Sequence, residues 1–242
     1  MRKDWLLLSP ERKMTTLTPL DRASLAAQYL RGSGIEIGAL HHPLPVPKDV
    51  SVRCVDRLPV SELRIQYPEL SAYDLVPVDI VDDGECLQTI PDASQDFVIA
   101  NHFLEHTEDP IGTLLNFFRV LREGGFLYMA IPDKRFTFDV DRPVTTLQHL
   151  IRDHAEGPAH SREAHYREWV RLVDKASGIA GEEALYKERT EKNYSIHFHV
   201  WRQQDMAELI AYMHTLTDFE ELEQVTLGWE CIFVLRKIPM QA

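Results

Sequence analysis

The sequence is poor in cysteine, carries no excess of positive charge and has no long apolar run. Its three cysteines, Cys54, Cys86 and Cys231, lack the spacing of a metal site, which favours a reducing cytoplasm. The formal net charge of −12 disfavours a nucleic-acid partner, because phosphate binding needs a basic surface. No stretch approaches the roughly 20 apolar residues of a membrane span, and residues 6–8 lack a signal-peptide cleavage pattern. We therefore expect a cytoplasmic protein without a membrane span.

The sequence also lacks the Gly-x-Gly-x-x-Gly run of dinucleotide-binding proteins. Instead, the strand predicted at residues 35–37 contains Glu36 and is followed by Gly38. An acid in so apolar a strand is costly unless a partner pairs with it, so Glu36 is a candidate ligand-binding group. Gly38 allows the backbone to approach a ligand closely. The missing glycines disfavour an NAD-dependent oxidoreductase, which remains an alternative.

Patterns of strand and helix alternate along most of the chain. This alternation is typical of a doubly wound, Rossmann-like α/β fold. We predict a seven-stranded sheet, mostly parallel, that ends in an antiparallel hairpin, with strands at residues 35–37, 50–55, 75–81, 96–100, 126–131, 222–227 and 231–235. Helices are expected at residues 25–30, 61–67 and 204–215, and from Pro110 to a stop at Gly124-Gly125.

Two divisions of the chain are predicted. Residues 1–30 form an N-terminal arm and a helix that is capped by Thr18 or Asp21. Residues 31–242 form the main domain. Within it, residues 133–200 break the strand–helix rhythm and are rich in charge and histidine, so we expect helices and loops inserted above the sheet.

Acids and amides follow the predicted strands. In a doubly wound sheet, ligands bind outside the carboxyl ends of the strands. Asp56 lies 20 residues after Glu36 (56 − 36), close to the roughly 20-residue offset of an acid that binds ribose hydroxyls. Alternatively, Asp56 only starts a turn before Arg57. The groups at this rim, which suit a ligand with hydroxyls and an amino group, are Glu36, Asp56, Asp82, Asp83, Asn101, His102 and Asp133.

These segments carry a likeness to a known family. Residues 30–135 resemble class I S-adenosylmethionine-dependent methyltransferases, in the small-molecule branch that includes enzymes of the ubiquinone pathway. Residues 132–139 and 196–201 are similar to methyltransferases found beside glycosyltransferases in surface-polysaccharide gene clusters. The motifs of the first resemblance are Glu36-Ile37-Gly38, Val55-Asp56, Asp83-Gly84-Glu85-Cys86-Leu87, Pro91-Asp92-Ala93-Ser94-Gln95-Asp96-Phe97, Leu104-Glu105-His106-Thr107-Glu108-Asp109-Pro110 and Leu121-Arg122-Glu123-Gly124-Gly125-Phe126-Leu127.

The resemblance implies S-adenosylmethionine as cofactor and S-adenosylhomocysteine as product. Glu36 and Gly38 would lie against the methionine end and the ribose, and Asp56 would bind the ribose hydroxyls. Asp83 would accept a hydrogen bond from the adenine amino group, with the Gly84 amide beside the ring. The other residues that we place on the cofactor side are Ala39, Arg57, His102 and, near the reactive methyl, Asn101.

The loop after Gly38 departs from the family pattern. The family usually has a Gly-x-Gly run here, whereas this chain continues with Ala39-Leu40-His41-His42-Pro43. The cofactor loop must therefore take another path, in which His41 or His42 can contact the ligand. This departure also supports an alternative function, a degenerate methyltransferase fold that serves as a binding or scaffold subunit.

Transfer of a methyl group to an alcohol needs a base for the hydroxyl proton, commonly His, Asp or Glu. The candidates near the rim are His102, His106 and Asp133. For His106 we favour packing of the loop over catalysis, because the Glu105-His106 pair recurs in the family that the sequence resembles.

The remaining histidines lie in or beside the predicted insertion. His197 and His199 alternate on a predicted strand and would face one way. We favour acceptor binding or packing for them over a metal site, because spacing sets no third ligand, and we predict no metal. The histidines that fit solvated faces are His149, His154, His160 and His165.

These features together favour a methyltransferase that acts on a small molecule or glycan, at oxygen. Direct displacement would place the nucleophile in line with the methyl group, so positioning supplies much of the catalysis. Residues 133–200 would then be the lid and the acceptor site.

Overall fold

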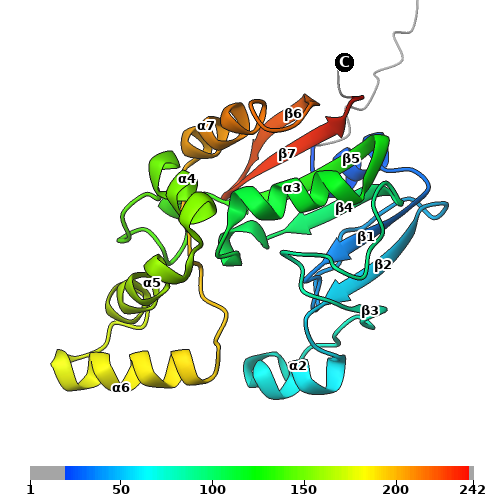
Figure 1. The fold of residues 1–242 in the computed structure, drawn as a ribbon. Coiled ribbons are helices and arrows are strands. Elements are labelled where there is room, and N and C mark those ends of the chain that lie inside the picture. Colours follow the sequence, from blue (N-terminus) through cyan, green and yellow to red (C-terminus); the bar gives the residue numbers. More distant parts are fainter. Residues whose placement is uncertain (1–19, 240–242) are drawn as a thin grey trace, which may run out of the picture.

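A seven-stranded sheet with helices on both faces is the framework of the chain (Figure 1). The computed structural model describes residues 20–239. The strand order is β3-β2-β1-β4-β5-β7-β6, parallel from β3 to β5, with β7 antiparallel to both β5 and β6. The predicted α/β sheet with a closing antiparallel hairpin is confirmed. The strands are β1 (Ser33–Ile37), β2 (Ser51–Asp56), β3 (Ile80–Val81), β4 (Gln95–Asn101), β5 (Leu121–Pro132), β6 (Phe219–Leu227) and β7 (Glu230–Lys237).

Two apolar layers enclose this sheet. On one face, Leu114, Leu150 and Leu209 join a core that also holds inward side chains of β1 and β5. On the other face, Leu25 packs with side chains of β4, β5 and β7. Among residues 20–239, no helix combines the length and apolar character needed to cross a membrane. The helices are α1 (Arg22–Tyr29), α2 (Val60–Gln66), α3 (Pro110–Val120), α4 (Leu147–Glu156), α5 (Ala159–Leu172), α6 (Gly178–Glu191) and α7 (Gln203–Met213), with short 3-10 turns at Pro68–Leu70, Leu104–His106 and Lys134–Phe136.

Local signals explain where the first helices begin. Asp21 caps α1 by accepting a hydrogen bond from the Ser24 amide, and the Ser24 side chain accepts one from the Asp21 amide. Asp109 caps α3 by accepting a hydrogen bond from the Gly112 amide. Pro110 occupies the first turn of α3, where no backbone donor is needed. Asp21 is thus the cap of α1, whereas the alternative cap Thr18 and the predicted arm at residues 1–15 lie outside the described residues.

The segment between β5 and α7 is an addition at one end of the sheet. It contains α4, α5 and α6, and Figure 1 shows α5 and α6 standing to one side of the strands. A small core of Tyr166, Trp169, Ile196 and Phe198 holds it together. No side chain of α6 is buried. Helices are therefore present where the insertion at residues 133–200 is predicted.

Two predicted boundaries differ from the structure. Strand pairing covers only Ile80–Val81 of the predicted strand at residues 75–81, because Pro77 has no amide to donate and the Val76 amide bonds to the Leu40 carbonyl. The α3 helix ends at Val120, so residues 124–125 do not end it and lie within β5.

Candidate active site

A cavity of about 660 Å³ lies between the carboxyl ends of the central strands and the inserted segment. This volume falls within the roughly 300–1,000 Å³ of small-molecule sites. Of the residues that the sequence places in the site, those on its wall are Gly38, Asp56, Arg57, Asp82, Asp83, Gly84, His102 and His106. The opposite wall, which comes from the inserted segment, includes Phe138, Tyr166, Trp169, Tyr194, His197 and Phe198.

Two glycines, Gly38 and Gly84, place main-chain atoms on the cavity wall. Gly38 has a left-handed conformation (φ +64°), and its amide donates to the Val55 carbonyl at 2.9 Å. A Cβ atom added to Gly84 would lie 2.5 Å from Cζ of Phe103 and 2.6 Å from Cγ2 of Ile37. Both distances are shorter than van der Waals contact, so only glycine fits at position 84 without rearrangement.

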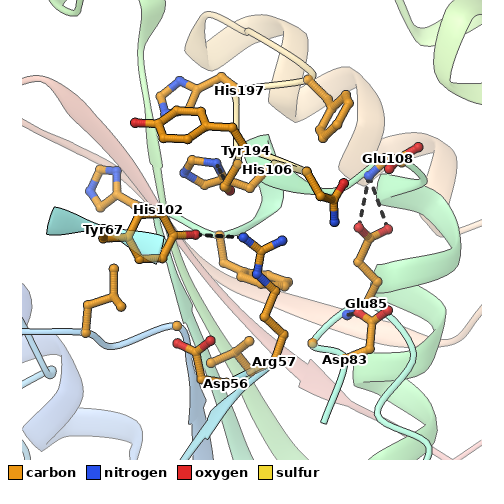
Figure 2. Close-up of a pocket in the computed structure, with 18 of the residues that line it drawn as sticks. Asp56, Arg57, Tyr67, Asp83, Glu85, His102, His106, Glu108, Tyr194 and His197 are labelled. Carbon is orange, nitrogen blue, oxygen red and sulfur yellow. Dashed lines mark hydrogen bonds between the residues drawn. The ribbon is translucent and has the colours of Figure 1, made fainter. Parts of the chain in front are cut away.

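Carboxyl groups occupy the sheet side of the cavity, with Asp56 and Asp83 in the lower part of Figure 2. Burial raises the pKa of Asp56, although the backbone amides of Arg57 and Leu58 offset part of this effect. Nη2 of Arg57 donates to the Tyr67 hydroxyl at 3.0 Å, and Figure 2 shows the Arg57 side chain between these two acids and Tyr67. The Asp83 side chain is exposed and accepts from the amide two residues later at 2.9 Å.

Glu36 and Asn101 lie behind this wall rather than on it. Glu36 is 1% exposed, and its carboxylate accepts from the Leu44 amide at 2.9 and 3.1 Å. Burial raises the pKa of Glu36 to about 7, with partial compensation from that amide and from Arg22. Both side-chain amide atoms of Asn101 are buried without a hydrogen-bond partner. Unpaired groups of this kind mark a site that a ligand or water completes.

His102 does not fit the predicted role of base. Burial alone would lower the pKa of His102, but contacts with the carboxylates of Glu105 and Glu230 raise it to about 9. Its Nε2 lies 2.8 Å from Oε2 of Glu230, and its Nδ1 lies 3.4 Å from Oε1 of Glu105. The ring also stacks on Trp229, with centroids 4.8 Å apart. The two carboxylates thus favour the protonated form of His102, which makes it a poor base, although the nearby Arg22 guanidinium opposes part of this effect.

His106 lies on the cavity wall, next to the buried carboxylate of Glu105. Nδ1 of His106 donates to the Ile196 carbonyl at 2.9 Å, which leaves Nε2 unprotonated. Burial, followed by repulsion from His197, lowers the pKa of His106 to about 4. His106 is thus a neutral imidazole and a weak base, and its bond to Ile196 supports the packing role that we favoured.

His197 forms a hydrogen-bonded pair with a carboxylate at the cavity. Its Nδ1 lies 2.7 Å from Oδ2 of Asp139, which is 1% exposed and accepts from Nη1 of Arg142 at 2.9 Å. Burial would raise the pKa of Asp139, but His197 and Arg142 hold it below its usual range. The Arg142 guanidinium also donates to the His197 carbonyl at 2.8 Å. An ionised Asp139 orients the imidazole and leaves Nε2 available to take a proton.

Asp133 lies away from the cavity and does not fit the predicted role of base. Its carboxylate accepts from Nε and Nη2 of Arg135 at 2.9 and 2.7 Å and from the Gln203 amide at 3.4 Å. These bonds occupy both oxygens, and they hold the pKa of Asp133 below its usual range despite burial.

The altered loop also differs from expectation. Ala39 is buried, and neither His41 nor His42 is on the cavity wall. The His41 ring instead packs against the rings of His42 and Tyr73, with centroids 4.0 and 4.4 Å apart. The loop contributes Gly38 and Leu40 to the cavity, the latter with a left-handed backbone (φ +49°).

Two clusters among residues 20–239 could hold a metal ion by the type and spacing of their side chains. One consists of Glu105, His106 and His197 beside the cavity, and the other of His149, Asp153, His165 and His199 behind the insertion wall. Contrary to prediction, residues 196–200 are not a strand, and His197 and His199 belong to different clusters.

Comparison with known proteins gives the family. A family model described as a methyltransferase domain matches residues 12–211. A curated protein of Mycolicibacterium smegmatis, named as a probable S-adenosylmethionine-dependent methyltransferase, is 31% identical over 130 residues, which cover 54% of this chain and 43% of that protein. The chain therefore spans less than half the length of this relative.

Two solved structures are similar to this chain at low sequence identity. A Rhodobacter sphaeroides protein provisionally described as a zinc-dependent alcohol dehydrogenase is 14% identical, with a TM-score of 0.54 over 87% of this chain and 86% of that one. A methyltransferase from Methanosarcina mazei, described as dependent on S-adenosylmethionine, is 12% identical, with a TM-score of 0.47 over 89% of this chain and 96% of that one. The family match, which extends over most of the chain, sets aside the oxidoreductase alternative. The chain belongs to the methyltransferase domain family of S-adenosylmethionine-dependent enzymes.

Proposed function

We propose that this protein methylates a hydroxyl group of a small molecule or glycan and that His197 is the general base. The observation that carries the proposal is that His197, on the cavity wall opposite the cofactor side of the sheet, is paired with the buried carboxylate of Asp139. Asp139 orients the imidazole through Nδ1, so Nε2 is the atom that receives the acceptor's proton. The positive charge that His197 then gains is balanced by Asp139 and by the nearby buried carboxylate of Glu105.

The sheet side of the cavity fits S-adenosylmethionine. When bound, this cofactor supplies a methyl group on a positively charged sulfur. Asp56, on the wall, would accept from the ribose hydroxyls, whereas Glu36 and Asn101, which lie behind the wall, would support the methionine end from there. Gly38 and Gly84 would place main-chain atoms against the ligand, because both are on the cavity wall and neither carries a side chain.

The insertion side fits an acceptor with apolar faces and hydroxyl groups. Phe138, Trp169, Tyr194 and Phe198 supply aromatic surface, and His197 supplies a polar group. Aromatic rings cover the apolar face of a sugar, whereas polar groups fix its orientation. A sugar of the surface-polysaccharide type is thus the acceptor class that we test first, and residues 133–200 are its binding site and lid.

Calorimetry with S-adenosylmethionine, S-adenosylhomocysteine and NAD tests the cofactor assignment. We expect the first two to bind and NAD not to bind. Release of S-adenosylhomocysteine, measured with a panel of sugars and small alcohols, then tests turnover. Binding of the cofactor without turnover on any acceptor would favour the scaffold alternative.

Replacement of His197 by Gln tests the base. We expect kcat to fall about 100- to 10,000-fold, the usual contribution of a general base, while affinity for S-adenosylhomocysteine changes little. The matched control is His154→Gln, because His154 also pairs with a carboxylate, Oδ2 of Asp109 at 2.9 Å, but lies outside the cavity wall. Equal kcat in His197→Gln and the control would refute His197 as the base.

A further inference from the structure

Among residues 20–239, four metal-ligating side chains that have no role in the proposed reaction lie behind the cavity wall that the inserted segment forms. His149 and Asp153 are one turn apart on α4, His165 is on α5, and His199 is on the extended segment before α7. One nitrogen or oxygen from each of the four lies within 4.8 Å of all the others. Nε2 of His149 is 3.0 Å from Nε2 of His165 and 3.0 Å from Oδ2 of Asp153. Three segments far apart in sequence thus converge on one point.

Burial makes this cluster costly without a further partner. Asp153 and His199 are both 0% exposed. Within the described part of the chain, the carboxylate oxygens of Asp153 make no contact with hydrogen-bond geometry and have only imidazole nitrogens near them, and Nδ1 of His199 is buried without a partner. A buried carboxylate without compensation is strongly destabilising. The groups that face it are His149 and His160, whose Nε2 lies 3.3 Å from Oδ1 of Asp153.

Nδ1 of His199 is available to bind a metal ion, because the other ring nitrogen, Nε2, faces a carbonyl group. Its Nε2 faces the Glu108 carbonyl at 3.4 Å, and its backbone amide donates to the Glu105 carbonyl at 3.2 Å. Metal-binding histidines commonly donate their second ring N–H to a carbonyl or carboxylate, which fixes the ring and leaves the other nitrogen as ligand. In His199 that other nitrogen is the unpaired Nδ1.

We propose that His149, Asp153, His165 and His199 bind one divalent transition-metal ion, with zinc as the preferred ion. Three imidazole nitrogens and one carboxylate oxygen match the ligand types of zinc. Ligand atoms about 2.0–2.1 Å from a tetrahedral zinc lie roughly 3.3 Å from one another. The distances between the ligand atoms of this cluster run from 3.0 Å to at most 4.8 Å, a range that includes this value. Since four protein ligands fill the coordination shell, this is a structural site.

Such an ion would hold the acceptor side of the cavity in place. Tyr166 follows His165, and Phe198 precedes His199, and both neighbours are on the cavity wall. The ion would join α4, α5 and the extended segment behind these aromatic side chains. We do not place the ion at the cluster of Glu105, His106 and His197, because it offers only three ligands. Its carboxylate also has another neighbour already, since Nδ1 of His102 lies 3.4 Å from Oε1 of Glu105.

Metal binding to tag-free protein tests the proposal. After dialysis against a chelator, the protein is titrated with Zn²⁺ in competition with a chromophoric chelator, and with Co²⁺ as a spectroscopic substitute. We expect one ion per chain, the intense visible absorption of tetrahedral Co²⁺, and a higher unfolding temperature with Zn²⁺. A wild-type protein that binds neither ion would overturn the proposal.

Variants locate the ion. His149→Gln and His165→Gln should each weaken zinc binding more than the 10- to 100-fold typical of losing a second-shell partner. His149 and His165 are partly exposed, so these variants disturb folding less than a change at His199 would. The matched control is His154→Gln, on the same helix but outside the cluster, which should bind zinc as the wild type does. Undiminished zinc binding by His149→Gln, or loss of zinc from His106→Gln instead, would show that the ion is not at this cluster.

Discussion

Replacement of Glu36 by Gln is expected to stabilise the folded chain above pH 7 and to weaken cofactor binding. Burial raises the pKa of Glu36 from its usual value of 4.5 to about 7, so the folded state binds more protons than the unfolded state between these values. Stability of the wild type therefore falls as the pH rises from 4.5 to about 7, and stays lowered above it. At 1.36 kcal/mol per pKa unit the difference amounts to about 3 kcal/mol.

The variant keeps the hydrogen bond but not the buried charge. A glutamine carbonyl can still accept from the Leu44 amide, which the Glu36 carboxylate does at 2.9 Å. Urea unfolding at several pH values should show equal stability of the two proteins near pH 4.5 and a gain of up to about 3 kcal/mol for Glu36→Gln above pH 7. Above pH 7, where Glu36 is ionised, affinity for S-adenosylhomocysteine should fall about 10- to 150-fold in the variant, from the loss of one charged hydrogen bond worth roughly 1.5–3 kcal/mol.

The control for this experiment is Glu221→Gln, which removes an exposed glutamate from β6. This change should leave both the pH dependence and the affinity close to those of the wild type. If the stability of Glu36→Gln relative to wild type did not change between pH 5 and pH 8, the carboxylate would not be held neutral by burial. Unchanged affinity in Glu36→Gln would remove Glu36 from the cofactor site.

Two further predictions concern buried contacts of the cavity. Arg142→Met should destabilise the fold by about 3–5 kcal/mol in urea unfolding, because Asp139 and Glu168 lose their shared partner and Asp139 stays buried; a loss below 1 kcal/mol would contradict this reasoning. Gly84→Ala should cost about 1–3 kcal/mol and weaken binding of S-adenosylhomocysteine, because its Cβ would overlap Phe103; calorimetry that shows wild-type affinity would mean that Gly84 does not approach the ligand.

The sequence predicts the sheet well because its signals are local. The strand at residues 35–37, the Asp21 cap and the Pro110 start of α3 depend only on neighbouring residues, and the structure has all three. The cofactor side of the cavity follows from the same logic, since parallel strands bring Gly38, Asp56 and Asp83 to one edge. Which of these residues bind the cofactor stays a prediction.

The acceptor side could not be predicted because its contacts are far apart in sequence. Asp139 and His197 are 58 residues apart, and no periodic pattern links them. His102 has the sequence position of a pocket residue, but its charge depends on Glu230, which is 128 residues away. One histidine cluster forms only when α4, α5 and His199 come together, and the other only when His197 meets the turn at Leu104–His106. The cytoplasmic location and the sugar acceptor likewise stay predictions.

The charged group around Glu230 has a consequence for how far the chain can be shortened. Arg22, on α1, and His102, after β4, both contact the Glu230 carboxylate at the start of β7. Through Glu230, α1 is thus linked to β7 and to His102 on the cavity wall, although the sequence led us to group it with an N-terminal arm. A fragment that begins at residue 31 would leave Glu230 with one cationic neighbour fewer. We therefore expect such a fragment to hold His102 less firmly at the cavity wall than the longer chain does.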